Sequence, residues 1–450
     1  MPYILFVNSF ATLLLKKIES GCTLNKCSKI KNSRLKVFQM TAIPLSQELL
    51  RKKKMIILGC GVIMYFFTNM SKVLIPATIF DDLLKTGLDV KSVSALGAFY
   101  MYAYAASQLL IGIFSDRFGG VRLLFAGCTL FTAGTIGFPF SEHLYLMYFF
   151  RVLTGFGAGM VFLGLAKLLA DLFPTRFAVA MGAMLVVGFI GPTAGTMIVF
   201  LVNAVGWRWA MAIPGMIAAL VLLGIVCFMK GTMEKMTSGQ SLVPFLTIIR
   251  KKEVWFLWVT SSVVFGSYYV LLAQIGQKSI ADFGGISPEK AAICVMIMTI
   301  MVAADNMGVN LMLKLCGNRR KAVGTGGIVC TLAGGLLGWY AFSHGLGLPG
   351  VFAAFFLIAL PAGFFPLYSL IAKELAPAEY TGLSVALINF MAFIFIALFQ
   401  NVSGRILQGF STVNGMFPAE AYSSVFLFIA LASIPALITA SLVPETRPKQ

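Results

Sequence analysis

The sequence predicts an all-α membrane protein with twelve transmembrane helices in two six-helix, pseudo-symmetric halves. Three observations support this fold class. The 450-residue chain is 59% hydrophobic and only 12% charged, whereas a soluble domain has roughly one quarter charged residues. Apolar segments of about 20 residues, the length of a helix that crosses a bilayer, recur along the chain. The longest polar connection falls after the sixth of these segments.

Each apolar segment is predicted to be one helix. In chain order the segments span 55–80, 93–114, 122–140, 144–170, 177–203, 208–229, 254–278, 289–313, 322–343, 349–372, 382–407 and 421–443. The domains then follow as a cytoplasmic N-terminal segment (1–54), an N-terminal six-helix half (55–229), a cytoplasmic linker (230–253), a C-terminal half (254–443) and a cytoplasmic tail (444–450).

Residues 1–39 begin apolar but lack the basic start and the small-residue cleavage site of a signal peptide. We treat this segment as dispensable and Met40 as a candidate for the native first residue. A native terminus before Met40 in a mass spectrum would refute that assignment.

Positive charge is concentrated in particular connections. The net charge is +18. Cations gather before the first span and in every second connection, whereas alternate connections such as "SEHL" (141–144) hold few. Cytoplasmic loops of membrane proteins carry such an excess. We therefore expect a multi-pass protein of the cell (inner) membrane with both termini in the cytoplasm, and no nucleic-acid partner.

Residue types that make enzymes or metal sites are sparse. The eight cysteines are scattered, mostly inside spans, so neither a disulfide framework nor a zinc ligand set is indicated. The two histidines, His143 and His344, fall in predicted outer connections, and the chain has no Walker phosphate-binding loop. The sequence therefore predicts no enzyme, no cofactor and no metal site, and it argues against ATP-driven transport by this chain.

The two halves retain traces of one repeated unit. When "GIFSDRFGGVR" (112–122) is set against "NLMLKLCGNRR" (310–320), Gly119 coincides with Gly317 and Arg122 with Arg320. "DLFPTRF" (171–177) and "ELAPAEY" (374–380) align their prolines at a similar offset. Duplicated six-helix halves around a midplane site are a common plan of transporters.

Several of these motifs are similar to those of one family. "GIFSDRFGGVR" resembles the Gly-x-x-x-Asp-Arg-x-Gly-x-x-Arg signature of the major facilitator superfamily, and "RVLTGFGAG" (151–159) resembles its fourth-helix pattern. "GWRWAMAIPG" (206–215) is similar to the start of its sixth helix. Within the superfamily, "GAFYMYAYAASQLLIGIFSDRFG" (97–119) most resembles bacterial permeases of the organophosphate and sugar-phosphate (organic anion) branch. The resemblance implies transport by alternating access.

The resemblance also implies a gate on the cytoplasmic side. Carried over residue by residue, its members are Gly112, Asp116, Arg117, Gly119 and Arg122, with Asp171 and Arg176 as partners. The alternative is that these charges only set the topology. Lys314 occupies the place of Asp116 in the second half, so a symmetrical gate is not expected.

Gly191 and Pro192 lie in "GFIGPTAG" (188–195), which resembles the fifth-helix Gly-Pro motif of antiporters in this family. Small residues at this spacing let helices approach closely, and a proline bends a span. Both an exchange mechanism and plain close packing fit the motif.

A lysine inside the first span indicates a binding site. At helical spacing, Lys72 shares a face with Tyr65, Thr68, Asn69 and Pro76. A cation near the bilayer centre costs roughly 2.5–3.5 kcal/mol on insertion scales. The polar stripe therefore favours a position facing a water-filled cavity and an anion, although a lone lysine could also extend to the headgroups.

Polar residues of three other spans could share that site. The candidate substrate-binding residues are Tyr65, Asn69, Lys72, Tyr104, Gln108, Arg151, Tyr268 and Tyr269. The tyrosines could equally be packing residues, and Arg151 could instead bind backbone carbonyls of neighbouring helices.

Asp305 is the carboxylate that lies clearly inside an apolar run of the second half. Burial favours the neutral form of a carboxylate, so Asp305 is the candidate for proton coupling. An ion pair with Lys314, about two turns further along the helix, is the alternative.

Together these features predict a secondary active transporter of a small solute, in the favoured interpretation an organic anion, driven by proton coupling or anion exchange. A proton-coupled exporter of drugs or siderophores is the alternative of the same class, and a transporter-like metabolite sensor is the alternative of another class. The expected partners are the lipid bilayer, the small-molecule substrate, and protons or a counter-transported anion. We expect a monomer.

Overall fold

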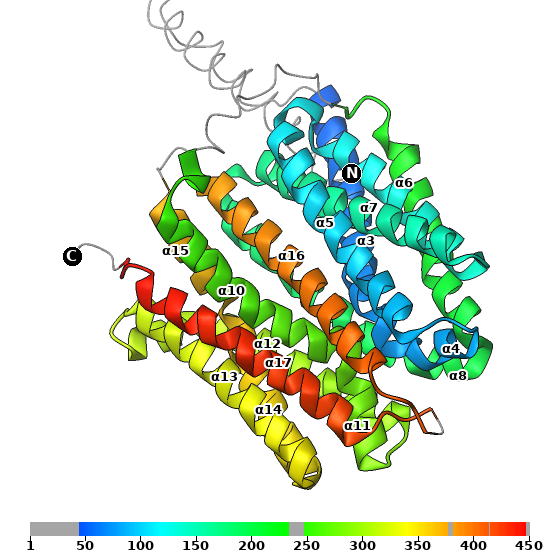
Figure 1. The fold of residues 1–450 in the computed structure, drawn as a ribbon. Coiled ribbons are helices and arrows are strands. Elements are labelled where there is room, and N and C mark those ends of the chain that lie inside the picture. Colours follow the sequence, from blue (N-terminus) through cyan, green and yellow to red (C-terminus); the bar gives the residue numbers. More distant parts are fainter. Residues whose placement is uncertain (1–44, 234–246, 377–380, 414, 447–450) are drawn as a thin grey trace, which may run out of the picture. The chain divides into compact units, whose positions relative to one another are not determined.

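The computed structural model describes residues 45–233, 247–376, 381–413 and 415–446, without the side chains of 45–47, 76, 77, 112–117, 177–179, 189, 310, 381 and 382. The described elements are α3 (Leu45–Val73), η1 (Leu74–Thr78), α4 (Phe80–Lys85), α5 (Val90–Phe118), α6 (Gly120–Gly137), η2 (Phe138–Phe140), α7 (Leu144–Leu172), η3 (Pro174–Arg176), α8 (Phe177–Met229), α10 (Lys252–Val270), η4 (Leu271–Ile275), α11 (Gly276–Gly284), α12 (Pro288–Leu315), α13 (Arg320–His344), α14 (Gly347–Ala359), η5 (Leu360–Phe364), α15 (Phe365–Leu375), α16 (Thr381–Gln408) and α17 (Ala419–Leu442) (Figure 1). The prediction of an all-α protein is confirmed.

The predicted twelve crossings can be followed along this chain. Ten helical stretches among the described residues are long and apolar enough to cross a membrane. One of them is most of α8, which is 53 residues long and contains a non-helical residue at Gly206 (φ 80°, ψ 157°). Because glycine tolerates positive φ, the chain turns there and α8 supplies two crossings. The 29-residue helix α5 supplies the remaining one.

Three crossings are interrupted. The first is broken at Ile75 (φ −122°, ψ 126°), since the residue before a proline disfavours the α conformation and Pro76 follows. The expectation of one continuous helix over 55–80 is therefore wrong. The seventh crossing contains a π-helical turn, η4, and continues to Gly284, beyond the predicted end at 278. The tenth contains a 3-10 turn, η5, that begins Leu360-Pro361.

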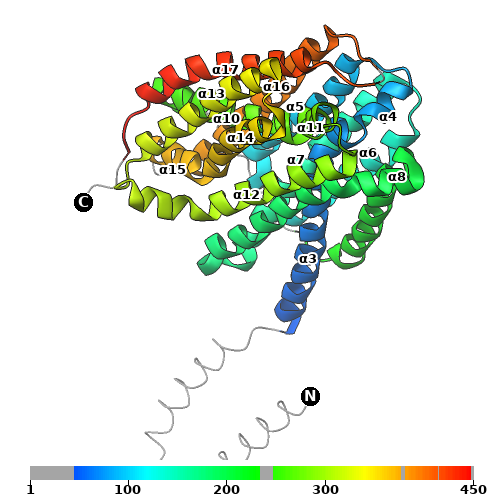
Figure 2. The same cartoon turned by 90° about the horizontal axis from the view of Figure 1, so that it is seen from below.

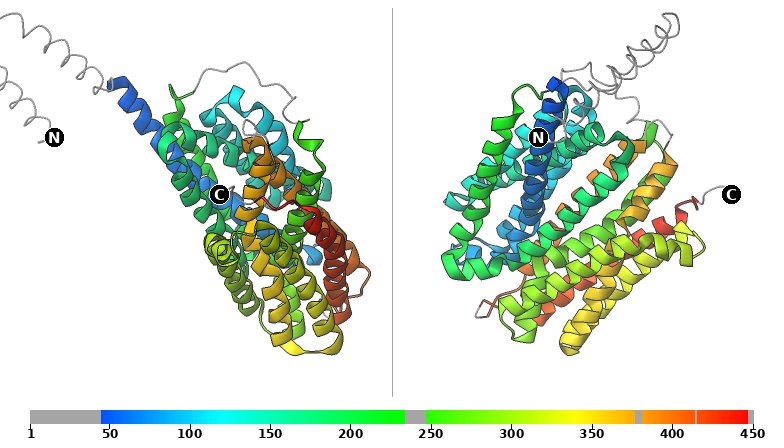
Figure 3. Two further views of the ribbon diagram at one scale, coloured as in Figure 1. Left: turned by 90° about the vertical axis from the view of Figure 1, so that its left-hand side faces the viewer. Right: turned by 180° about the vertical axis from the view of Figure 1, so that it is seen from behind.

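Each half has its own close helix packing. In the first half α7 packs against α6 and α5, and in the second half α13 packs against α17 and α14 (Figure 2). The halves meet along a seam where α5 packs against α16 (Figure 1) and α8 packs against α12 (Figure 3, right). At the same seam η1 contacts η4. The seam therefore brings the broken part of the first crossing onto the π-helical turn of the seventh.

We call the end of the bundle at α4, α11 and the α16–α17 connection the distal end, which lies towards the bottom of Figure 1. The opposite end, with Gly119, η3 and Lys251, is the proximal end. The outward faces of the bundle are apolar: Leu220 of α8 is 68% exposed and Leu311 of α12 is 64% exposed. Contact with lipid hydrocarbon explains such exposure, because a monomer in water rarely exposes contiguous apolar patches of this kind.

Candidate functional site

Lys72 lies at the end of α3, just before the break at Ile75, and its side chain is 4% exposed. Its Nζ donates a hydrogen bond to Asn69 Oδ1 at 2.9 Å. The same atom lies 4.4 Å from the centroid of the Tyr104 ring and 4.8 Å from that of Phe393. Tyr104 belongs to α5 and Phe393 to α16, so the ammonium sits on the seam between the two halves.

The predicted polar stripe of α3 is held together by local hydrogen bonds. Asn69 Nδ2 donates to Tyr65 O at 2.8 Å, which leaves Asn69 Oδ1 to accept from Lys72. Thr68 O accepts from the Tyr100 hydroxyl at 2.7 Å. These bonds fix the stripe in position before any solute arrives.

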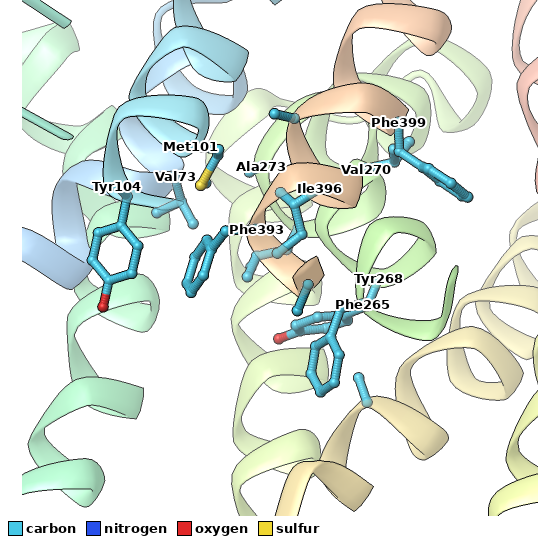
Figure 4. Close-up of a cluster of buried hydrophobic side chains, with 14 of the residues drawn as sticks. Val73, Met101, Tyr104, Phe265, Tyr268, Val270, Ala273, Phe393, Ile396 and Phe399 are labelled. Atoms are coloured by element: carbon cyan, nitrogen blue, oxygen red, sulfur yellow. The ribbon is translucent and has the colours of Figure 1, made fainter. Parts of the chain in front are cut away.

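The two rings beside Lys72 form a pair across the seam. The centroids of Tyr104 and Phe393 are 4.3 Å apart, with an interplanar angle of 45°. Figure 4 shows the two rings side by side, with Tyr268 and Phe265 of α10 farther from Tyr104, beyond Phe393. A cation over ring faces is stabilised by the negative potential of the π system, so these rings hold the ammonium without neutralising its charge.

Arg151 of α7 is 3% exposed and is held by other first-half groups. Its Nε donates to Leu96 O at 3.1 Å, and its Nη1 and Nη2 lie 3.4 and 3.5 Å from Ser71 Oγ and O. The guanidinium lies 4.6 Å from the centroid of the Tyr100 ring. This geometry matches the alternative in which Arg151 ties helices together through backbone carbonyls.

Two other candidates make contacts within their own half. Gln108 Nε2 donates to Gly159 O of α7 at 3.2 Å, so it joins two helices of the first half. Tyr268 is buried and its ring is 5.5 Å from that of Tyr269 in a T-shaped pair. The substrate roles assigned to these residues stay predictions.

Gly191 brings α8 against α3 directly behind the lysine site. A Cβ at Gly191 would lie 2.7 Å from Phe66 O and 2.8 Å from Asn69 Cβ, closer than real Cβ contacts. Only glycine therefore allows this approach, and the motif around Pro192 has at least the packing role. Its role in exchange stays a prediction.

Asp305 lies in the middle of α12 against η5. A Cβ at Gly363 would be 2.4 Å from Asp305 Cβ, so the carboxylate-bearing residue is packed onto the 3-10 turn. Asp305 Oδ2 is buried and has no hydrogen-bond partner among the described residues. The alternative pairing with Lys314 is not found among the ion pairs of the described residues.

The predicted proximal gate is described only in part. The side chains of Gly112, Asp116 and Arg117 lie outside the described residues, so their pairing stays a prediction. Gly119 (φ 78°) precedes α6, and Leu123 N donates to its carbonyl. Arg122 is half-buried, and Arg176 lies in the exposed turn η3.

The proximal ion pairs that are described each join elements of one half. Asp171 Oδ2 lies 4.0 Å from Lys54 Nζ in the first half, a partner that sequence reasoning did not assign. In the second half Arg320 pairs with Glu374. These pairs do not test the expectation that the gate is asymmetric, because the side chain of Asp116 lies outside the described residues.

Two groups were missed by sequence reasoning. Phe393 had no signal, because nothing in an apolar helix marks the ring that will meet a lysine of the other half. Lys278 was placed at the end of the seventh span with no role, yet its Nζ lies 2.7 Å from Asp81 Oδ1 of α4. The four-residue spacing of Lys278 and Asp282 was the available signal, since such residues share a helix face.

The fold and the lysine site define a multi-pass helical membrane protein with polar groups at the seam of two six-helix halves. The family model of the Major Facilitator Superfamily matches residues 57–400. The chain belongs to that superfamily, as the motifs predicted, and no catalytic family is indicated.

Curated relatives match short segments. The chain is 34% identical over 131 residues to the Multidrug resistance protein B homolog of Mycobacterium tuberculosis, which covers 28% of this chain and 24% of that protein. It is 28% identical over 142 residues to Multidrug resistance protein 3 of Bacillus subtilis, covering 30% and 27%. The chain thus matches about a quarter of the length of these relatives.

Solved structures match nearly the whole fold. The nucleoside transporter NupG aligns with a TM-score of 0.66 at 14% identity, over 87% of this chain and 98% of that one. The D-xylose-proton symporter aligns with a TM-score of 0.64 at 15% identity, over 88% and 99%. At such identity the likeness shows the fold alone, and it confirms the predicted two-half architecture.

Proposed function

We propose that this chain is a secondary active transporter that moves a small organic anion by alternating access across the bacterial inner membrane, with both termini in the cytoplasm. One observation carries the proposal. Lys72 is buried on the seam of the two halves, and no carboxylate among the described residues lies within ion-pair distance of it.

The lysine has donors available for a ligand. An ammonium carries three N–H donors, and Asn69 is the one hydrogen-bond acceptor that contacts it among the described residues. A buried charge without a counter-charge is costly, so an anion that binds Lys72 would remove most of that cost. Phe393, from the other half, touches the same ammonium, which would let the bound anion act on both halves.

The resemblance to organophosphate and sugar-phosphate permeases supports phosphate monoesters as the first class to test, with small carboxylates as the second. A phosphate oxygen accepts charge-assisted hydrogen bonds of the kind that a lysine donates.

Uptake into proteoliposomes tests this proposal. We expect accumulation of a phosphate monoester or a small carboxylate, and at least a roughly tenfold lower rate for Lys72→Met, the loss expected when a charge-assisted bond is removed. Lys72→Arg keeps the charge and should retain part of the uptake. Lys91→Met, a change at an exposed lysine outside the site, is the matched control. Full uptake of anions by Lys72→Met would refute the anion assignment.

Asp305 is proposed as the proton-coupling group. Its buried Oδ2 lacks a hydrogen-bond partner among the described residues, which is the environment in which a carboxylate binds a proton readily. We expect Asp305→Asn to abolish accumulation driven by an imposed pH gradient while counterflow of preloaded substrate continues. An Asp305→Asn protein that still accumulates substrate along the gradient would remove this residue from the proton path and favour anion exchange.

Export of drugs is the second candidate function. It is favoured by the names of the curated relatives, two of which are multidrug resistance proteins, and by the aromatic pair of Tyr104 and Phe393 at the site. A cationic dye such as ethidium distinguishes the two, because dye efflux that survives Lys72→Met would support export of drugs. Binding of a metabolite with neither uptake nor efflux would instead favour the sensor.

A further inference from the structure

Among the residues that the structure describes, five polar contacts join the two halves between the middle of the seam and its distal end. They are Lys278–Asp81, Gln274–Ser94, Gln408–Asp89, Asn401–Tyr102 and Asn203–Glu289. Together with the contact of η1 with η4, they close the distal end in this structure. The proposed function leaves this closure unexplained. The polar groups of the closed distal end fall into two layers, one of partnered ions and one of poorly hydrogen-bonded side chains.

The outer layer is an ion cluster of Lys278, Asp81 and Asp282. Lys278 Nζ lies 2.7 Å from Asp81 Oδ1, 3.4 Å from Asp282 Oδ1 and 2.8 Å from Gly415 O. Lys278 and Asp282 are nearly fully buried, whereas Asp81 is half exposed. The lysine is therefore well partnered when the halves are together.

The second-half members of this cluster hold each other in place. Asp282 Oδ2 accepts from the Tyr422 hydroxyl at 2.6 Å and from Phe417 N at 2.9 Å. Asp81 comes from α4 of the first half. The ion pair of Asp81 with Lys278 is thus the part of the cluster that would break if the halves moved apart, and Lys278 would keep Asp282 as a counter-charge.

The inner layer is an amide layer of Gln274, Gln400, Ser94 and Ser403. Gln274 Nε2 donates to Ser94 Oγ at 2.9 Å and to Gln400 O at 3.0 Å. All four side chains are at most 2% exposed. α5 and α16 are in close contact here, since a Cβ at Gly404 would lie 2.3 Å from Ser94 Cβ.

Much of the amide layer lacks hydrogen bonds. Gln274 Oε1, both side-chain polar atoms of Gln400, and Ser403 Oγ have no partner among the described residues. A buried polar group without a partner carries its full desolvation penalty, and replacing it by an apolar group of the same shape can be stabilising. The closed seam is therefore penalised at this layer, whereas opening would expose the same atoms to water.

We propose that the distal seam is a gate whose two layers oppose each other: the ion cluster holds it shut, and the amide layer, centred on Gln400, favours its opening. The opposition keeps the closed and open states close in free energy, which a small ligand needs if its differential affinity is to shift the population. This inference rests on the proposed alternating access, because a gate is meaningful only if the distal end opens.

Hydrogen–deuterium exchange of the intact protein in lipid nanodiscs tests the gate without a substrate. The reporters are peptides over residues 79–90 and 276–288, and a peptide over 137–144, away from the seam, is the internal reference. We expect Asp81→Asn to raise distal exchange roughly tenfold, the effect of losing one charge-assisted hydrogen bond. The Asp81→Asn variant should still fold, since Lys278 keeps Asp282 as a counter-charge.

The decisive comparison uses neighbouring residues of α16. Asn401 donates to the Tyr102 hydroxyl across the seam at 3.2 Å, so Asn401→Leu should raise distal exchange. Gln400→Met removes two unpartnered polar atoms and should lower distal exchange roughly threefold or more, the size expected of a desolvation penalty removed. Ser403→Ala should lower it as well, and it provides a second test if Gln400→Met does not fold.

The proposal is overturned if the variants of both layers change distal exchange in the same direction. If Gln400→Met and Ser403→Ala raise exchange as Asn401→Leu does, the amide layer holds the seam closed and the two layers do not oppose each other. Unchanged exchange in Asp81→Asn would show that the ion cluster does not hold the gate. Hydrogen–deuterium exchange does not measure transport. If Asp81→Asn raises distal exchange and Gln400→Met lowers it while the protein shows no uptake, the gate is upheld and the transporter proposal is refuted.

Discussion

Lys72 and Arg151 are two buried cations of the same half, and their surroundings differ in one respect. Arg151 contacts Leu96 O and Ser71 and lies over Tyr100, all within the first half. Lys72 has one hydrogen-bond acceptor, Asn69, and two ring faces, one of them from the second half. The contacts of the arginine among the described residues all come from the first half, whereas the lysine also meets a ring of the second half.

This difference teaches how a buried charge can be assigned a role. Burial alone is ambiguous, because charged residues inside membrane spans are found in both structural and functional positions. Contact with the other half distinguishes the two: Lys72 meets Phe393 of the second half, whereas the contacts of Arg151 among the described residues all lie in the first half. On this criterion we propose Arg151 as a positioning residue that braces α7 against α3 and α5, and Lys72 as the ligand-binding cation.

The largest stability effect should follow from removing the arginine. Arg151→Met leaves Leu96 O and Ser71 without their charged partner, and we expect a loss of about 2–3 kcal/mol, the range for hydrogen bonds to charged groups. Thermal unfolding in detergent measures it. Arg151→Lys keeps the charge but loses the forked geometry of the guanidinium. Its stability should therefore lie between that of the wild type and that of Arg151→Met.

The distinction between Arg151 and Lys72 would be wrong if Arg151→Met unfolds at the wild-type temperature yet loses uptake. That result would restore Arg151 as a substrate ligand, the role that the sequence assigned to it.

A smaller loss of stability is expected for a change at Tyr100, whose ring lies under the Arg151 guanidinium. Tyr100→Phe keeps the ring face but removes the hydroxyl that donates to Thr68 O at 2.7 Å, so stability should fall by about 1 kcal/mol, the net worth of one hydrogen bond. Unfolding experiments report the change, with Tyr145→Phe at an exposed position as the reference. A tenfold fall in uptake at unchanged stability would instead place Tyr100 at the substrate.

The sequence predicted what depends on local pattern. Apolar length identified the crossings, and helical spacing grouped Lys72 with Asn69 and Tyr65, a stripe whose hydrogen bonds are now described. It failed at Ile75, where a single X-Pro step ended a helix that the hydrophobic pattern continued to residue 80. Breaks of this kind result from backbone sterics, which a hydropathy pattern does not report.

Contacts between the halves could not be predicted in the same way. Phe393 lies at Lys72 only because α16 packs on α5, and the pair of Lys278 with Asp81 depends on the distal closure of the seam. These contacts form between residues far apart in the chain, where no periodicity links the partners. A single sequence therefore indicates which side chains are unusual but not which of them meet.

The smallest stability effect is expected at the lysine itself, which is the sharpest test of the comparison. Lys72→Met loses the bond to Asn69 and the contacts with two rings, but it also removes a buried charge that has no counter-ion. Since these terms oppose each other, we expect the free energy of unfolding to change by less than about 1 kcal/mol, the net size of one hydrogen bond, in either direction. Thermal unfolding of Lys72→Met beside Arg151→Met, in the same detergent, measures both changes at once. Destabilisation of Lys72→Met as large as that of Arg151→Met would mean that Lys72 is a brace as well, and contact with the other half would then fail as a criterion for the binding cation.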